Sequence, residues 1–306
     1  MNTAVKNTPG LASRFINGVL AIKPLANLAK HQARQMMIKR AEKIGVNWTQ
    51  EVRTLQARDW TKDFAKVQNP QVTYPGYYLQ SFHAYDKGDL CWEAALEVEV
   101  AAQTVHATLW GKTTDQGDAQ LRQSYHNILT KQLPRPPQAI LDIGCSVGMS
   151  TFALQKIYPH AKITGLDLSP YFLAVAQYRS QQRGVNIDWV HAAAESTGLA
   201  SASFDFVSMF LICHELPQVA TRQIFAEAKR VLRPGGCIGI MDMNPRSEVY
   251  QKMPTYVMTL LKSTEPLMDE YFSFDIEQAL VDAGFKTPTI TPNSPRHRTI
   301  VAQVRD

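Results

Sequence analysis

Residues 139–148 read Ala-Ile-Leu-Asp-Ile-Gly-Cys-Ser-Val-Gly, and most of the predicted fold follows from this segment. Its apolar first half is typical of a buried strand, and the glycines of its second half predict a tight turn. Residues 149–158 then predict an amphipathic helix, and a second apolar run, 163–167, ends in the acid Asp167. A strand, a glycine turn, a helix and a strand that ends in an acid form a nucleotide-binding unit of a doubly wound α/β sheet.

The spacing Asp142-x-Gly144-x-Ser146-x-Gly148 narrows the choice of ligand for this unit. Glycines let the backbone approach a ligand, a helix N-terminus presents free N–H groups, and an acid such as Asp167 can accept both ribose hydroxyls. A dinucleotide needs G-x-G-x-x-G spacing for its pyrophosphate, which a carboxylate at position 142 would repel. The same carboxylate suits the ammonium group of S-adenosylmethionine (SAM), so the spacing favours SAM over a nicotinamide dinucleotide.

The segment resembles motif I of the class I SAM-dependent methyltransferases, with Ser146 in place of the usual middle glycine. Downstream segments are similar to the acidic loop, motif II and the turn before the fifth strand of that family; they are Ala194-Glu195, 203–207 and 231–236. Together these motifs resemble the subgroup that contains the ubiquinone and menaquinone methyltransferases (type 11). The resemblance covers roughly residues 120 to 306.

The resemblance implies an α/β fold with a Rossmann-like, doubly wound, seven-stranded sheet whose last hairpin is antiparallel. The expected strands are residues 139–143, 163–167, 187–190, 206–212, 237–243, 287–291 and 299–304. A polar stretch at 113–117 marks a domain boundary. We therefore expect a mainly helical N-terminal extension over residues 1–117 and a SAM-dependent methyltransferase catalytic domain over 118–306.

The resemblance also implies which residues bind SAM. The expected cofactor-binding residues are Asp142, Gly144, Cys145, Ser146, Gly148, Asp167, Leu168, Ala194, Glu195, Phe210 and Tyr125. Tyr125 shares a helix face with apolar neighbours, so burial in the core is the alternative for it. The family usually has an acid at the position of Ala193, which accepts a hydrogen bond from the adenine amino group. Its absence leaves backbone groups to recognise the ring edge.

The catalytic candidates follow the fourth and fifth expected strands, because ligands of a doubly wound sheet bind outside the carboxyl ends of its strands. His214 is the expected base for an acceptor that carries a proton, and capping of the next turn is its alternative role. Glu215 is a weaker candidate, and Asp242 and Asn244 are expected to orient the acceptor. No spacing of metal ligands is present in the sequence, so no metal dependence is expected.

Two segments outside the expected sheet are rich in aromatic or soft apolar residues. Residues 72–88 contain Tyr74, Tyr77, Tyr78, Phe82, His83 and Tyr85, and they predict either a cover over the substrate pocket or plain packing. His83 reaches the site only if this segment is a cover. Residues 245–272 hold several Met and Tyr residues, which suit an apolar or aromatic acceptor or serve helix packing.

The first forty residues contain seven basic residues and no acid. This region predicts a short helix with an apolar face before Pro24 and a second helix at 25–44. Further helices are expected at 47–66 and 89–109. Such a basic region suggests peripheral contact with an anionic membrane, packing on the catalytic domain or on another subunit, or an organellar presequence.

The composition of the 306 residues, with 45% hydrophobic and 19% charged residues, is typical of a globular protein. The net charge of +5, without arginine-rich or aromatic-interleaved stretches, gives no sign of nucleic-acid binding. The four cysteines, at positions 91, 145, 213 and 237, lack paired spacing and predict free thiols in a reducing compartment. We therefore expect a cytoplasmic protein without a membrane span.

The sequence thus favours a SAM-dependent methyltransferase that acts on a small, apolar or aromatic molecule by in-line displacement at the sulfonium methyl. Two alternatives stay open at this point. One is a catalytically silent SAM-binding module, because Ser146 and Ala193 depart from the family pattern. The other is a nicotinamide-dependent oxidoreductase, which Asp142 and the glycine spacing disfavour. The identity of the acceptor and the oligomeric state do not follow from the sequence.

Overall fold

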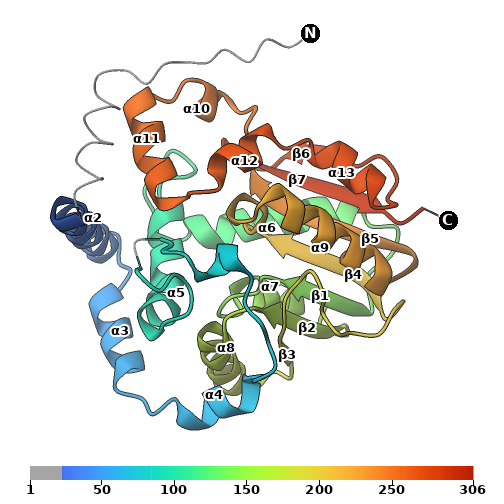
Figure 1. Ribbon diagram of the computed structural model, residues 1–306, viewed down its shortest axis with the longest axis horizontal. Helices are drawn as coiled ribbons and strands as arrows, with labels where there is room; N and C mark the ends of the chain where they lie inside the picture. Colours follow the sequence, from blue (N-terminus) through green and yellow to red (C-terminus); the bar gives the residue numbers. More distant parts are fainter. Residues whose placement is uncertain (1–22, 84, 306) are drawn as a thin grey trace.

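The computed structural model describes residues 23–83 and 85–305, which are built around one seven-stranded sheet (Figure 1). Its strands are β1 (Ala139–Ile143), β2 (Lys162–Asp167), β3 (Asp188–His191), β4 (Phe204–Phe210), β5 (Leu232–Met243), β6 (Thr289–Pro292) and β7 (His297–Gln303). They lie in the order β3-β2-β1-β4-β5-β7-β6. Strands β1 to β5 are parallel, whereas β7 is antiparallel to β5 and to β6. The expected sheet with an antiparallel last hairpin is confirmed.

The order of the strands fixes where a ligand can bind. β1 pairs with β2 on one side and with β4 on the other, so the direction in which strands are added reverses at β1. Ile143 at the end of β1 pairs with Leu166 of β2 and with Met209 of β4. The carboxyl ends of these three strands are therefore level and form the crevice where open α/β sheets bind ligands.

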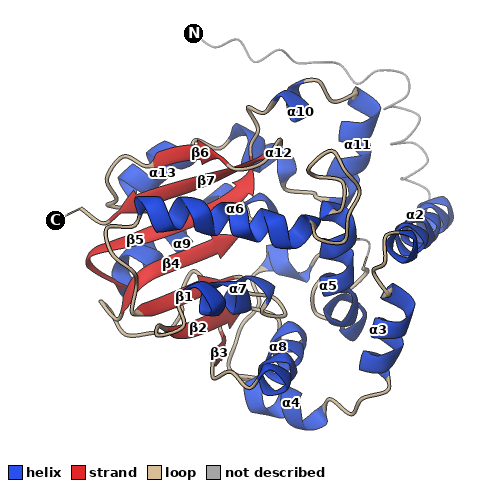
Figure 2. Cartoon of the chain, turned by 180° about the vertical axis from the view of Figure 1, so that it is seen from behind, coloured by secondary structure: helices blue, strands red, loops and turns tan. Residues whose placement is uncertain are grey.

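Helices cover both faces of the sheet (Figure 2). α6 (Gly117–Gln132) and α7 (Met149–Ile157) lie on one face, and α9 (Gln218–Val231) and α13 (Ile276–Asp282) lie on the other. Alternate residues of β4 accordingly join different apolar clusters, Phe206 with α6 and Val207 with α9. Because both faces are covered, the β4 residues other than Asp205 and the buried Ser208 are apolar.

Local sequence signals account for the ends of α8 (Pro170–Arg183). The Ser169 side chain accepts a hydrogen bond from the backbone N–H of Phe172, and Pro170 occupies the first helical turn. Gly184 ends the helix in the left-handed conformation, with φ of +62°. This helix follows Asp167 directly, so its caps also fix the position of that acid.

The N-terminal segment, residues 23–106, lies around one end of the sheet. Its elements are α2 (Lys23–Lys43), α3 (Trp48–Gln56), α4 (Thr61–Val67), the 3-10 helix η1 (Gly76–Leu79) and α5 (Trp92–His106). Helices α4 and α5 both pack against α8. The Arg58 guanidinium lies 4.1 Å from the centre of the Tyr178 ring, which joins the extension to α8 by a cation–π contact.

The single helix expected at residues 47–66 is wrong, because the chain breaks between α3 and α4. Asp59 causes the break, since its Oδ1 accepts hydrogen bonds from both the backbone N–H and the hydroxyl of Thr61. These bonds start a new helix at Thr61. The short helix expected before Pro24 lies outside the described residues.

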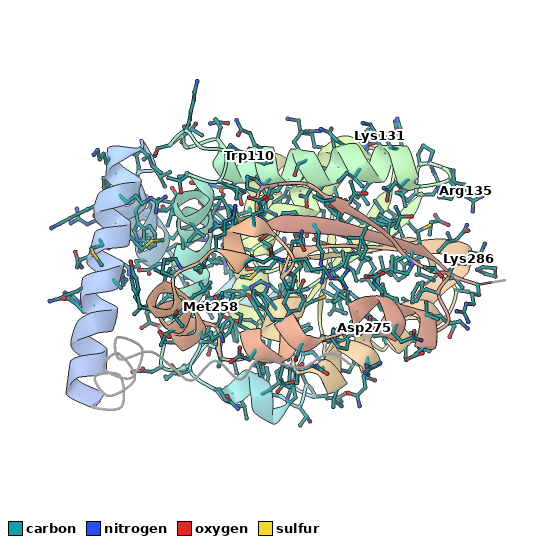
Figure 3. All side chains as sticks on the ribbon, turned by 90° about the horizontal axis from the view of Figure 1, so that it is seen from above. Trp110, Lys131, Arg135, Met258, Asp275 and Lys286 are labelled. Atoms are coloured by element: carbon teal, nitrogen blue, oxygen red, sulfur yellow. The ribbon has the colours of Figure 1, made fainter. Side chains whose placement is uncertain are left out.

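The basic helix α2 lies at the end of the molecule opposite to Lys286 (Figure 3). Arg34 forms an ion pair with the buried Glu97 of α5, and Arg40 donates a hydrogen bond to Thr108 Oγ1 at 2.7 Å. These contacts support the alternative in which the basic region packs on the rest of the chain, at least for α2.

An insertion between β5 and α13 forms three short helices, α10 (Glu248–Gln251), α11 (Thr255–Thr264) and α12 (Met268–Ser273). Among the described residues, no helix is both long enough and apolar enough to cross a bilayer. All four cysteines are buried, and none forms a disulfide. The expected free thiols are therefore confirmed.

Candidate functional site

A cavity of about 830 Å³ opens at the level carboxyl ends of β1, β2 and β4. Its floor comes from the catalytic domain, and α5, the segment around η1 and α11 close it from above. The volume is at the upper end of the range for small-molecule sites. We call the part formed by the strand ends of β1, β2 and β3 the cofactor half. The acceptor half is formed by α5, by the 3-10 helix η2 (Cys213–Glu215) and by the end of α11.

The turn after β1 lines the cofactor half. Gly144 has a φ of +67°, and a Cβ there would lie 2.1 Å from Ile212 Cδ1. Ser146 also adopts a left-handed conformation, with φ of +50°, at the position where the family has glycine. Its hydroxyl is buried without a hydrogen-bond partner. The turn therefore keeps the shape of a glycine turn and adds one unsatisfied polar atom that faces the cavity.

Asp167 lines the cofactor half at the end of β2. Its Oδ2 accepts a hydrogen bond from the backbone N–H of Ser146, and its Oδ1 accepts one from the backbone N–H of Ser169, both at 2.8 Å. Burial raises the pKa of Asp167 to about 7, although these hydrogen bonds act in the opposite direction. The carboxylate is therefore held in place but only partly ionised near neutral pH.

Glu195, after β3, is the acid nearest to the position where the family usually has one. Its Oε1 accepts a hydrogen bond from the hydroxyl of Tyr77 on η1 at 2.6 Å, and its Oε2 is buried without a partner. Ala194 lines the cavity beside it, and Leu168 faces the same space. A carboxylate oxygen of Glu195, one of the expected cofactor-binding residues, is therefore available in addition to the backbone groups.

The expected cover is confirmed, because most aromatic residues of the segment 72–88 line the cavity. They are Tyr77, Tyr78, Phe82, His83 and Tyr85. His191 fixes the start of this segment, since its Nδ1 accepts a hydrogen bond from the backbone N–H of Asn69 at 2.9 Å. Its Nε2 then donates to the carbonyl of Leu168 at 3.1 Å. The extension is thus tied to the strand ends by backbone groups as well as by side chains.

His214 and Asp242 form a hydrogen-bonded pair at the end of β4 and β5. His214 Nδ1 lies 2.7 Å from Asp242 Oδ1, and Asp242 is fully buried. Because Nδ1 donates to the carboxylate, Nε2 is the nitrogen left for the cavity, which His214 lines. Burial lowers the pKa of His214, but the charge of Asp242 and its hydrogen bond outweigh burial and raise the pKa to about 10.

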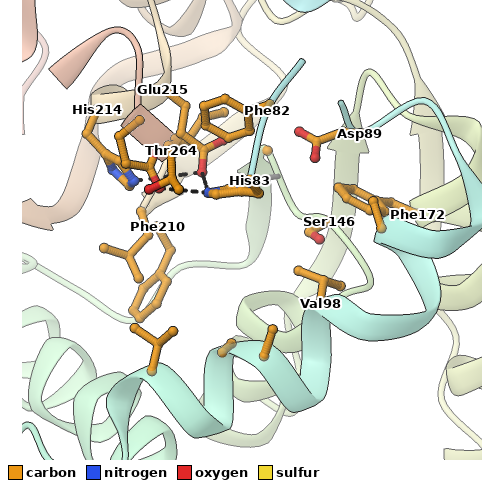
Figure 4. Close-up of a pocket in the computed structure, with 18 of the residues that line it drawn as sticks. Phe82, His83, Asp89, Val98, Ser146, Phe172, Phe210, His214, Glu215 and Thr264 are labelled. Atoms are coloured by element: carbon orange, nitrogen blue, oxygen red, sulfur yellow. Dashed lines mark ion pairs between the residues drawn. The ribbon is translucent and has the colours of Figure 1, made fainter. Parts of the chain in front are cut away.

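Glu215 follows His214 and also lines the cavity. Burial raises the pKa of Glu215 to about 8, against the lowering effect of His83 and His214. His83 Nε2 lies 3.7 Å from Glu215 Oε1 and 2.9 Å from Glu265 Oε1 (Figure 4). Glu265 was not singled out in the sequence, because one acid at the end of α11 carries no spacing signal. The fold alone brings it to the site.

Four expected site residues and Asn244 do not line the cavity. Asp242 acts through His214, whereas Asn244 Oδ1 accepts a hydrogen bond from the backbone N–H of Arg246. Tyr125 lies in the core with its hydroxyl 3.3 Å from Ser208 Oγ, as its alternative proposed. The expected cofactor contact of Tyr125 and the expected acceptor contact of Asn244 are therefore corrected.

Asp142 and Gly148 lie beneath the turn instead of on its cavity side. Asp142 Oδ2 accepts hydrogen bonds from Ser150 Oγ at 2.6 Å and Thr151 Oγ1 at 2.7 Å. A Cβ at Gly148 would lie 2.7 Å from the Trp189 ring. Asp142 therefore fixes the first turn of α7, and Gly148 allows that helix to pack closely. Asp142 Oδ2 thus has a positioning role, and the expected contact of Asp142 with the ammonium group of SAM stays a prediction.

An apolar face of α5 lines the acceptor half. Ala94, Val98, Ala101 and Val105 of α5 face the cavity, and Val105 is 44% exposed. The residues of α5 that pack inward are others, such as Leu96 and Val100. Val98 lies across the cavity from Glu215 (Figure 4). The apolar wall therefore faces the polar groups of η2.

The chain is similar to known methyltransferases over part of its length. Residues 140–236 match the family described as a methyltransferase domain. The chain is 39% identical over 100 residues to a malonyl-(acyl-carrier protein) O-methyltransferase of Hahella chejuensis, with 33% of this chain and 34% of that protein covered. It is 37% identical over 115 residues to a demethylmenaquinone methyltransferase of Chlorobaculum parvum, with 37% and 45% covered. The chain thus spans less than half the length of these two curated relatives.

Two further likenesses extend over more of the chain. An uncharacterized methyltransferase of Synechocystis is 27% identical over 164 residues, with 53% of this chain and 74% of that protein covered. The structure of a candidate O-methyltransferase from Nostoc punctiforme has a TM-score of 0.55 at 18% identity, covering 80% of this chain and 67% of that chain. At this identity the structural likeness shows a shared fold.

Proposed function

The domain at residues 140–236 belongs to the class I SAM-dependent methyltransferases, and from this premise we propose that the chain methylates a small, apolar or aromatic acceptor that carries a proton. One observation carries the proposal: the His214–Asp242 pair opens into the same cavity as the glycine turn and Asp167. A cofactor site alone needs no such pair. A base beside the reacting centre is required only where the acceptor must lose a proton.

The cofactor half fits SAM by its donor set. Asp167 would accept the ribose hydroxyls, and Glu195 Oε2, which lacks a partner, would accept a hydrogen bond from the adenine amino group. The Ser146 hydroxyl, also without a partner, is available to the polar end of the cofactor. SAM supplies a methyl group on a sulfonium, which is electrophilic without further activation. The chain's own task is then to align an acceptor and to handle its proton.

His214 and Asp242 divide that task. His214 Nε2 would take the proton from the acceptor oxygen or carbon when the imidazole is neutral, while Asp242 keeps Nδ1 protonated and stabilises the imidazolium that forms. Because Asp242 raises the pKa of His214 to about 10, the neutral form and the rate of transfer should increase as the pH rises toward that value. The apolar face of α5 would hold the body of the acceptor against the opposite wall. Tyr77, Tyr78 and the rest of the cover exclude water from the reacting centre. These roles favour phenols, enols and activated carbon acids as acceptors.

Calorimetric titration with SAM, S-adenosylhomocysteine and NADH tests the cofactor part of the proposal. We expect micromolar binding of the first two, loss of binding in Asp167→Ala, and no change in Asp282→Ala, which alters an exposed acid of α13. Tight binding of NADH without binding of SAM would favour an oxidoreductase.

Radiolabelled methyl transfer to a library of phenols and enols tests the catalytic part. We expect His214→Asn to abolish transfer, whereas His160→Asn, on an exposed loop, leaves it unchanged. Binding of SAM with no transfer to any acceptor, by a protein with an intact His214, would favour a SAM-binding module without catalysis.

The place of the protein in the cell is also proposed. The four buried free thiols are compatible with a reducing, cytoplasmic environment. The exposed basic residues of α2, such as Lys39, support peripheral contact with an anionic membrane. Co-sedimentation with phosphatidylserine vesicles at low and high salt would detect such contact, and equal recovery in the supernatant with and without vesicles would exclude it.

A further inference from the structure

Three ligand-type side chains from distant segments meet in the acceptor half. They are His83 from the cover, Glu215 from η2 and Glu265 from the end of α11, and one ligand atom of each lies within 4.8 Å of the others. His83 Nε2 lies 2.9 Å from Glu265 Oε1 and 3.7 Å from Glu215 Oε1 (Figure 4). Two ligands about 2.1 Å from one metal ion lie roughly 3.0 to 3.4 Å apart in octahedral or tetrahedral geometry. The observed separations therefore need little adjustment to accept an ion.

A second observation points to a missing partner. Glu265 is buried, with 9% of its side chain exposed, and its Oε2 has no hydrogen-bond partner. A buried carboxylate oxygen without a partner is costly, so it calls for a cation or a donor. Within the described part of the chain, Glu215 and Glu265 form ion pairs only with histidines. No lysine or arginine pairs with the buried Glu265 or the partly buried Glu215 there.

We propose that His83, Glu215 and Glu265 bind one divalent cation in the acceptor half. One imidazole and two carboxylates suit Mn²⁺ or Zn²⁺, because imidazole binds the later transition metals and carboxylates bind hard cations. Mg²⁺ fits less well, since it prefers oxygen ligands and retains its water. His83 is 39% exposed toward the cavity, so coordination positions remain open on that side.

The ion would join the three segments that close the cavity. The cover, η2 and the insertion have no common secondary structure, and an ion held by one residue of each would lock them together. It would also lie next to His214, whose Nε2 is 3.7 Å from Glu215 Oε1. A role in orienting an acceptor oxygen beside His214 rests on the proposed methyl transfer, whereas binding of the ion does not.

Binding of the metal is therefore measured without SAM or an acceptor. Protein stripped with EDTA is titrated calorimetrically with MnCl₂, ZnCl₂ and MgCl₂, and bound metal is counted by mass spectrometry after dialysis. We expect one Mn²⁺ or Zn²⁺ per chain and weaker binding of Mg²⁺. His83→Asn and Glu265→Gln should each weaken binding at least about 10-fold. The matched control is Glu93→Gln, an exposed acid that lines the same cavity outside the cluster, and it should leave the affinity unchanged.

Two results would overturn the metal site. One is the absence of saturable binding of either ion below about 1 mM. The other is equal affinity in the unmodified protein and in Glu265→Gln, which would show that His83 and Glu265 form a simple ion pair. A variant that unfolds once the metal is removed cannot be compared by titration. In that case anomalous diffraction from crystals of the unmodified protein soaked in MnCl₂ locates the ion, and density away from the cluster would contradict the proposal. Any of these failures leaves SAM binding and methyl transfer to be judged by their own assays.

Discussion

The cofactor half and the acceptor half of the cavity are assembled from different kinds of sequence. The cofactor half comes from the ends of three successive parallel strands of one domain, including Gly144, Asp167 and Glu195. The acceptor half comes from α5, which precedes these strands in the chain, and from η2 and α11, which follow them. The difference shows that a cofactor site can be a local property of a fold, while an acceptor site depends on how later additions fold over it.

If the two halves work separately, removing the base should affect only catalysis. We expect His214→Asn and Asp242→Asn to lower kcat for a proton-bearing acceptor by about 10² to 10⁴-fold, because each change removes one member of the pair proposed to take the proton. The Kd for SAM, measured by calorimetry, should stay within about twofold. Radiolabelled methyl transfer under saturating SAM provides the rate.

A large loss of SAM affinity in either variant would show that the His214–Asp242 pair supports both halves of the cavity. The two halves would then not function separately. His160→Asn on the surface serves as the matched control for the histidine change. Equal rates in His214→Asn and in the unmodified protein would remove His214 from the mechanism.

The second largest expected effect is the pH dependence of SAM binding, which depends on Asp167 in the cofactor half. Its pKa is raised by burial to about 7, and the nearby Asp89 adds to the rise, while the N–H groups of Ser146 and Ser169 oppose it. Only the carboxylate can accept both ribose hydroxyls, so affinity for SAM should be full above pH 7 and should fall as Asp167 gains a proton below it. We expect about a 10-fold loss in Ka between pH 8 and pH 6, measured by calorimetry.

Asp167→Asn provides the control for this pH dependence, because an amide does not titrate in the range. The variant should bind SAM weakly at every pH, without the fall below pH 7. If the slope persists in Asp167→Asn, another group titrates, and Asp89 is the first to examine because it lines the same cavity.

The sequence predicted the cofactor half better than the acceptor half for a physical reason. Gly144, Ser146 and Asp167 lie within one strand-turn-helix-strand unit, where spacing along the chain fixes spacing in space. His83 and Glu265 meet only after the cover and the insertion fold over the sheet, and no periodicity encodes that contact.

The cavity-lining face of α5 and the position of Asp142 do not follow from the sequence for the same reason. Periodicity cannot distinguish an apolar face that meets the core from one that lines a cavity, as that of α5 does. Asp142 was placed on the ligand by its spacing, yet Ser150 and Thr151 hold it one layer below. The hydrogen bonds from these two residues of α7 determine where the Asp142 carboxylate lies, and the spacing of the motif does not reveal them.

The apolar wall of the acceptor half should affect the acceptor alone. Val98→Phe adds a ring to the face of α5 that lines the cavity, so we expect the KM for the acceptor to rise about 10-fold while the Kd for SAM is unchanged. Val219→Phe makes the same exchange at a 68% exposed position of α9 and should change neither value. A rise in the Kd for SAM would show that the two halves overlap at Val98.

The smallest effect tests a hydrogen bond between the cover and the cofactor half. The Tyr77 hydroxyl of the cover holds Glu195 Oε1 at 2.6 Å, which leaves Oε2 free for the adenine amino group. Tyr77→Phe removes one hydrogen bond, so we expect SAM to bind about 2- to 10-fold more weakly by calorimetry. Tyr256→Phe, on a half-exposed ring of α11, should have no effect. A loss above about 100-fold would mean that the extension builds the cofactor half as much as it covers it, and the separation drawn between the two halves would then fail.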